Sequence, residues 1–132
     1  MTRHEDYHCS NIIIFSTQFY TTLEGEGPSS FEKWTKHKNI DVFEKKFLFI
    51  PINKTKHWLL VVIVNPGYLP SYYSEGVGKP FVIVLDSRPF LDYKIITSNV
   101  HSWLNQEAVR LEKIKNIEGL KEKSLPTLTP KG

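Results

Sequence analysis

Two apolar runs, residues 58–64 and 81–85, constrain the fold of this chain more than any other feature. Both are rich in valine, isoleucine and leucine, and neither alternates with polar residues, so each predicts a strand buried on both faces. A third run, residues 47–52, precedes a polar turn at 53–56. We therefore expect a central sheet covered by other parts of the chain.

Apolar residues at helical spacing lie on both sides of these runs. Phe19, Tyr20 and Leu23 predict one helix, which a break at Gly25, Gly27 and Pro28 ends. Ser30 is placed to cap a short helix that carries Phe31 and Trp34. A further helix running to about Gln106 is indicated by apolar residues that share one side, namely Ile95, Ile96, Val100, Trp103 and Leu104.

The remaining segments are assigned from composition. Residues 1–10 are polar, and residues 68–79, rich in Tyr, Ser, Gly and Pro, predict a surface loop. We expect a final strand within 108–114 and a flexible tail over 119–132. Strands and helices mix without regular βαβ alternation, so the predicted class is α+β, with one partial domain over residues 11–118.

Composition bounds the classes of function. No apolar run approaches the roughly 20 residues of a membrane span, and the polar start does not resemble a secretory signal. A single cysteine, Cys9, excludes an internal disulfide framework and suits a reducing compartment. The net charge of +3 is mild, and lysines and glutamates interleave over 112–123. This alternation is typical of a solvated face and argues against a nucleic-acid groove.

His57 and Asp86 flank the two buried runs, one just before 58–64 and the other just after 81–85. If the runs pair as antiparallel strands, these two side chains lie together. A carboxylate beside a histidine ring fixes its tautomer and stabilises the imidazolium, as a general base requires. The pattern is also open to a turn histidine and a strand-ending aspartate, and the connection is long enough for a parallel crossover.

Three other residue sets could carry chemistry. Trp58 could line a substrate channel beside the candidate base, although an indole that starts a buried strand also suits the core. Thiolate catalysis would need Cys9 beside His57, and nothing around Cys9 suggests activation, so we interpret it as structural or incidental. His4, His8 and Cys9 could ligate a metal, but no paired set follows at finger-like spacing, so we expect no metal site.

Short elements of the sequence resemble the ubiquitin-like-protein-specific cysteine proteases, the sentrin/SUMO-specific enzymes. In chain order they are Trp34-Thr35-Lys36, Asp41-Val42-Phe43, Pro51-Ile52-Asn53, His57-Trp58 and Asp86-Ser87, a specific combination although each alone is weak. Residues 14–23 are similar to the family's helix upstream of the first element, and the helix bearing Trp103 and Leu104 matches the one after the aspartate, so the resemblance covers most of residues 11–107. The long connection at 65–80 resembles the divergent branch of the family that edits poly-SUMO chains.

The resemblance implies a papain-like α+β protease domain, present in part, with a central mixed or antiparallel sheet flanked by helices. It implies that His57 is the general base, Asp86 its orienting carboxylate, and Trp58 one wall of a channel for a C-terminal diglycine, where any Cβ would clash. The implied reaction is hydrolysis of the isopeptide bond between SUMO and a substrate lysine. The implied partners are SUMO and its conjugates, in the nucleus or also the cytoplasm, and no cofactor is implied.

The chain departs from the family pattern at two residues that the reaction requires. The family's oxyanion glutamine and nucleophilic cysteine follow the segment that matches 108–130, and this chain ends at Gly132 before either. Gln18 and Gln106 stand elsewhere, and Cys9 precedes the histidine. Losing a triad member removes several orders of magnitude in rate, so we expect a fragment that is inactive alone. The alternatives are a non-catalytic SUMO-binding module and, on positive charge alone, a nucleic-acid-binding domain.

Overall fold

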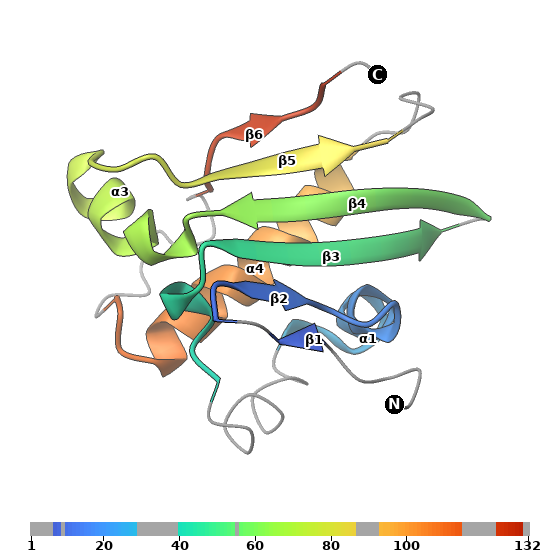
Figure 1. Cartoon of the computed structure of the whole chain (residues 1–132), viewed down its shortest axis with the longest axis horizontal. Helices are drawn as coiled ribbons and strands as arrows, with labels where there is room; N and C mark the ends of the chain where they lie inside the picture. Colours follow the sequence, from blue (N-terminus) through green and yellow to red (C-terminus); the bar gives the residue numbers. More distant parts are fainter. Residues whose placement is uncertain are drawn as a thin grey trace.

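A computed structural model describes residues 7–8, 10–28, 40–54, 56–86, 93–114 and 124–130 of the protein. Within these residues six strands form one sheet in chain order (Figure 1). The β2–β3 and β5–β6 pairs are parallel and the other three are antiparallel, so the sheet is mixed. The strands are β1 (Tyr7–His8), β2 (Ile12–Ile14), β3 (Phe47–Lys54), β4 (His57–Val64), β5 (Phe81–Leu85) and β6 (Thr127–Leu128).

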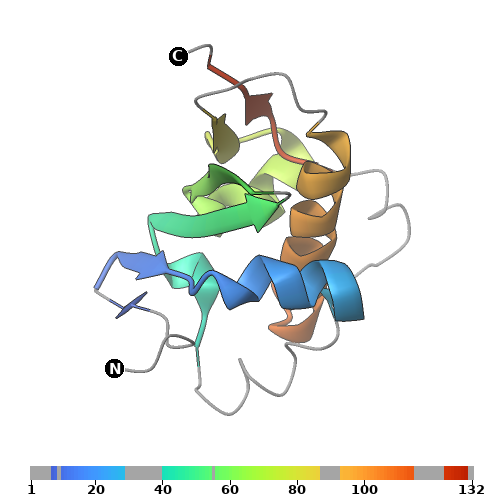
Figure 2. The same ribbon diagram turned by 90° about the vertical axis from the view of Figure 1, so that its right-hand side faces the viewer.

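Three described α-helices accompany the sheet: α1 (Gln18–Glu26), α3 (Leu69–Glu75) and α4 (Lys94–Arg110), with single 3-10 turns η2 (Val42–Glu44) and η3 (Pro66–Tyr68). Helix α4 crosses one face of the sheet, behind the strands in Figure 1 and beside them in Figure 2. Helix α1 contacts both β3 and α4. The predicted α+β class is therefore confirmed. None of the helices described is long and apolar enough to cross a bilayer.

The core lies between the sheet and α4. Alternate residues of the central strands are buried on this face: Leu48, Ile50, Ile52, Leu59, Val61, Ile63, Val82 and Val84. Trp103 of α4 is completely buried and meets Phe15 and Phe19 edge-on, with ring centroids 5.6 Å and 4.9 Å away. The predicted strands at 47–52, 58–64 and 81–85 are all present, but β4 is buried on both faces only in its second half.

The segment predicted as a surface loop, 68–79, is instead partly helical. Leu69 is completely buried, and Tyr72 and Tyr73 pack against the core, which stabilises α3. A proline in the first helical turn is tolerated because the backbone N–H groups there have no helical partner. Gly76 ends the helix in a left-handed conformation at φ 70°. The residues that suggested a loop are thus the start and stop signals of a short helix.

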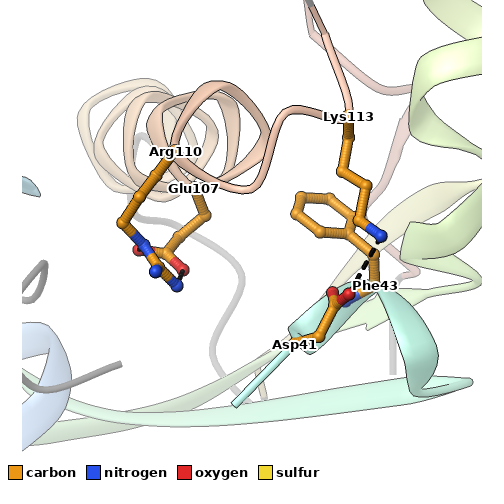
Figure 3. Close-up of polar contacts among 5 residues, drawn as sticks. All are labelled: Asp41, Phe43, Glu107, Arg110 and Lys113. Atoms are coloured by element: carbon orange, nitrogen blue, oxygen red, sulfur yellow. Dashed lines mark hydrogen bonds and ion pairs between the residues drawn. The ribbon is translucent and has the colours of Figure 1, made fainter. Parts of the chain in front are cut away.

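The strand predicted within 108–114 is also wrong, and the helix predicted to end near Gln106 continues to Arg110. Ala108 is completely buried on the helix, and its carbonyl accepts a bond from the Lys113 N–H at 2.8 Å in the closing turn. Glu107 and Arg110 form an ion pair one turn apart at 2.9 Å (Figure 3). Lys113, beyond the end of the helix, forms an ion pair at 2.9 Å with Asp41, the residue that caps the η2 turn (Figure 3). The buried Ala108 and the Glu107–Arg110 pair both suit a helical last turn in place of the predicted strand.

The end of helix α1 and the C-terminal segment differ from the sequence-based prediction. Helix α1 includes Gly25 and ends at Glu26, and the N–H of the following Gly27 donates to the Leu23 carbonyl at 2.9 Å. Within the region predicted as a flexible tail, Leu125 is buried and β6 pairs with β5. An apolar side chain and a sheet edge thus hold this part of the tail. The predicted short helix from Ser30 lies outside the described residues.

Trp103 should be the side chain on which the core depends most. Replacing it with alanine should lower the free energy of unfolding by about 3–5 kcal/mol, because it leaves a large cavity. Its Nε1 has no hydrogen-bond partner among the described residues. Trp103→Phe removes this unpaired donor along with part of the ring, so it should cost only about 1–2 kcal/mol. Urea unfolding of the three proteins tests this; equal losses in both variants would contradict the packing described.

His101 should make stability fall in mild acid. Its Nδ1–H donates to the Thr97 carbonyl at 2.8 Å, and its Nε2 accepts from the Leu125 N–H at 3.1 Å, and the second bond is lost if Nε2 is protonated. Burial lowers the pKa of His101 in the folded protein. Below about pH 6.5 the unfolded chain therefore binds more protons than the folded one, and stability is lost as the pH falls. Above that pH the contribution is complete and constant.

The His101→Gln variant keeps an acceptor for Leu125 but does not titrate. The free energy of unfolding of the wild type should fall more steeply than that of the variant below pH 6.5, by up to about 1.4 kcal/mol per pH unit. Urea unfolding of both proteins between pH 5 and 8 measures the difference between their free energies of unfolding. Because both proteins contain the other histidines, the contributions of those residues cancel in the difference. Parallel curves would refute the role of His101.

Candidate active site

Strand pairing brings His57 and Asp86 to one end of the sheet. Strands β4 and β5 pair antiparallel as predicted, with Leu60 opposite Leu85. His57 stands two residues before the buried Leu59, and Asp86 stands two residues after the buried Val84. Since side chains alternate between faces, both project from the core face of the sheet.

The two side chains are in direct contact. His57 Nε2 lies 2.5 Å from Asp86 Oδ1. The Asp86 side chain is 1% exposed and that of His57 is 13% exposed, so the carboxylate lies beneath an imidazole that solvent still reaches. An ionised carboxylate only accepts hydrogen bonds, so this contact assigns the proton of the neutral ring to Nε2. Nδ1 is then the ring atom that can exchange a proton with a reacting group.

Tyr93, which precedes α4, completes this arrangement and was not identified from the sequence. Its hydroxyl donates to Asp86 Oδ2 at 2.7 Å. Burial, the hydrogen bond to Asp86 and the charge of that carboxylate together raise the pKa of Tyr93 to about 12. The hydroxyl therefore remains a donor throughout the neutral range. A buried aspartate at the end of a strand needs hydrogen-bond donors for both of its carboxylate oxygens. From the sequence, this requirement is the one argument that could have suggested a further donor such as Tyr93.

Trp58 is adjacent to His57 in the chain but belongs to the other face of the sheet. It pairs with Asn53 across the β3–β4 hairpin, and alternation along β4 directs its side chain away from the core. The residue is 56% exposed. The interpretation of Trp58 as a core residue is therefore wrong, while its role as a channel wall stays a prediction.

The other candidates do not join His57 and Asp86 in the described structure. Gln18 is exposed at the start of α1. Gln106 is exposed on α4, roughly 18 Å along the helix from its beginning near Tyr93. Cys9 lies outside the described residues, as do His4 and the Trp34-Thr35-Lys36 element.

The arrangement is suited to proton transfer. An imidazole held by a buried carboxylate can take a proton from a thiol, hydroxyl or water and then donate it to a leaving group. The carboxylate stabilises the imidazolium that forms in between. A group that is to be attacked would have to lie at the exposed edge of His57.

Curated relatives of this chain are proteases of ubiquitin-like proteins. Sentrin-specific protease 6 of Mus musculus is 37% identical over 102 residues, which are 66% of this chain and 9% of that protein. Probable ubiquitin-like-specific protease 2A of Arabidopsis thaliana is 49% identical over 57 residues, 42% of this chain and 7% of that protein. The chain thus spans a small part of these relatives.

Solved structures share the fold. A crystal structure of the de-sumoylating protease has a TM-score of 0.70 at 23% identity, covering 96% of this chain and 46% of that one. The C-terminal Ulp1 protease domain, solved in complex with Smt3, the yeast ortholog of SUMO, has a TM-score of 0.61 at 19% identity, with 92% and 47% covered. The chain spans about half of each.

The family model described as Ulp1 protease family, C-terminal catalytic domain, matches residues 1–128. This match takes in both strands that carry the site as well as the helix that supports it. The chain therefore belongs to the Ulp1 protease family.

Proposed function

We propose that this chain supplies the base and carboxylate of a SUMO-specific cysteine protease, which hydrolyses the isopeptide bond between SUMO and a substrate lysine. The observation that carries the proposal is the buried contact between His57 and Asp86. Membership of the Ulp1 family supports the reaction class. The names of the sentrin-specific relatives support the substrate class.

In the proposed reaction His57 takes the proton of a cysteine thiol at Nδ1, and the thiolate attacks the carbonyl carbon of the terminal glycine of SUMO. The imidazolium is stabilised by Asp86 and gives its proton to the leaving lysine amine. Water then attacks the thioester, again with His57 as base, and releases SUMO. We assign the nucleophile to a cysteine other than Cys9, whose place in the chain gives no sign of activation.

Trp58 is proposed to contact the C-terminal diglycine of SUMO. Its exposure next to the base in sequence supports this role, because an aromatic wall there would admit glycine and exclude residues with a Cβ. A preference for poly-SUMO chains is proposed from the long 65–80 connection. A nuclear location is proposed from the family resemblance alone, and imaging of the tagged full protein would test it.

The competing proposal is a SUMO-binding module without catalysis. It would hold if no cysteine of the full natural protein reaches the exposed edge of His57. Both proposals require binding of SUMO, and they differ in turnover. A nucleic-acid-binding role has no supporting observation beyond the mild positive charge.

His57→Ala should abolish cleavage by the full natural protein that contains this chain. We expect hydrolysis of a fluorogenic SUMO amide by the wild type, and a loss of about 10³-fold or more in kcat/KM for the variant, because the thiol loses its base. Lys46→Ala, at an exposed position, is the control and should retain activity. Absence of turnover in the wild type would favour the binding module, and full activity of His57→Ala would refute the assigned base.

Trp58→Ala should weaken the binding of SUMO to this chain by at least about tenfold, as truncation of a central interface tryptophan commonly does. Tyr68 is a matched control, because it is 53% exposed, close to the 56% of Trp58, and lies in η3 at the far end of β4. Tyr68→Ala should leave the dissociation constant within twofold. Calorimetric titration with SUMO measures both; equal effects of the two substitutions would remove Trp58 from the proposed interface.

A further inference from the structure

We propose that Tyr93 is a positioning residue of this site, whose hydroxyl holds Asp86 so that the carboxylate fixes the ring of His57. The inference deepens the proposed protease function and rests on it for its kinetic consequence. Its structural part concerns the orientation of His57 and can be tested without turnover.

The carboxylate of Asp86 is held at both oxygens. Oδ1 contacts His57 Nε2 at 2.5 Å, and Oδ2 accepts from the Tyr93 hydroxyl at 2.7 Å. The terminal torsion of an aspartate is broad, so one hydrogen bond leaves the carboxylate considerable freedom to rotate. A second bond from the opposite side restricts this rotation. The direction of the acceptor that His57 meets is thereby fixed.

Solvent is poorly placed to replace the tyrosine. The Asp86 side chain is 1% exposed, so water has little access to Oδ2 if the hydroxyl is removed. Loss of one donor from a buried carboxylate is costly, and the carboxylate is expected to rotate or shift in response. Either movement would disturb the contact with His57.

Tyr93 is itself anchored by α4. Its carbonyl accepts from the Thr97 N–H at 2.8 Å and from the Thr97 hydroxyl at 3.0 Å, within the first turn of the helix. The helix is fixed in the core by Trp103. The hydroxyl is therefore presented by a rigid element, as a precise site requires.

Tyr93 is suited to positioning and poorly suited to proton transfer. With a pKa raised to about 12, the hydroxyl keeps its proton in the neutral range and remains a hydrogen-bond donor. A group intended as a base or acid would have a pKa closer to the working pH. The tyrosine acts on the reaction only through Asp86 and His57.

Tyr93→Phe tests the inference, and Tyr73→Phe is the matched control. Tyr73 also donates from a partly buried hydroxyl at 2.7 Å, but to Asn105 on α4, and burial raises the pKa of Tyr73 to about 12 as well. Both variants lose one hydroxyl and one hydrogen bond of the same length. Only the first loss affects Asp86.

Nitrogen-15 NMR of the imidazole ring in this chain reports the tautomer of His57. We expect the wild type and Tyr73→Phe to show mainly the form protonated at Nε2, and Tyr93→Phe to show a mixture of both tautomers. An unchanged His57 spectrum in Tyr93→Phe, or the same change in both variants, would overturn the positioning role.

The kinetic consequence is measured in the full natural protein. Tyr93→Phe should lower kcat for a SUMO substrate by about tenfold to a hundredfold with KM unchanged, while Tyr73→Phe stays within twofold. An active enzyme with an unaffected kcat in Tyr93→Phe would refute the inference and leave the proposed function intact. A wild type without turnover would refute the proposed function, and the NMR result would still decide the role of Tyr93.

Discussion

The antiparallel register of β4 and β5 is the constraint on which the site depends. With Leu60 opposite Leu85, His57 and Asp86 leave their strands at the same end and on the same face. A slip of one residue would turn every side chain of one strand to the other face and separate the pair. Burial of Val82 and Val84 beneath α4 holds this register. The same apolar packing that stabilises the sheet therefore creates the contact between base and carboxylate.

Helix α4 connects the core with the site and with the C-terminal strand. Trp103 packs on Phe15 and Phe19, Tyr93 at its start reaches Asp86, and His101 binds the backbone of Leu125. One helix thus supports three features that are distant in sequence. Polar groups buried along α4 would cost free energy if they lost their hydrogen-bond partners. Arrangements that keep these bonds are therefore favoured, and the site has a defined geometry.

The sequence was sufficient for the three central strands β3, β4 and β5 and for the contact of His57 with Asp86, because long apolar runs have few alternatives and their ends locate the polar side chains; β1, β2 and β6 were not predicted. It was insufficient for α3, where Pro70 and Gly76 act as helix signals although such residues equally suit a loop. The strand predicted within 108–114 was wrong because apolar alternation over so few residues does not distinguish a strand from the last turn of a helix. Tyr93 was missed because its role depends on a contact across the fold, for which local spacing gives no signal.

In the proposed reaction, His57 and Asp86 are the base and carboxylate for a thiol other than Cys9. Mass spectrometry of the full natural protein, after reaction with a SUMO that carries a C-terminal electrophile, identifies the attacking residue directly. We expect one labelled cysteine, distinct from Cys9, and loss of labelling in the Asp86→Ala variant. Labelling at Cys9, or labelling that persists without Asp86, would contradict the proposed reaction.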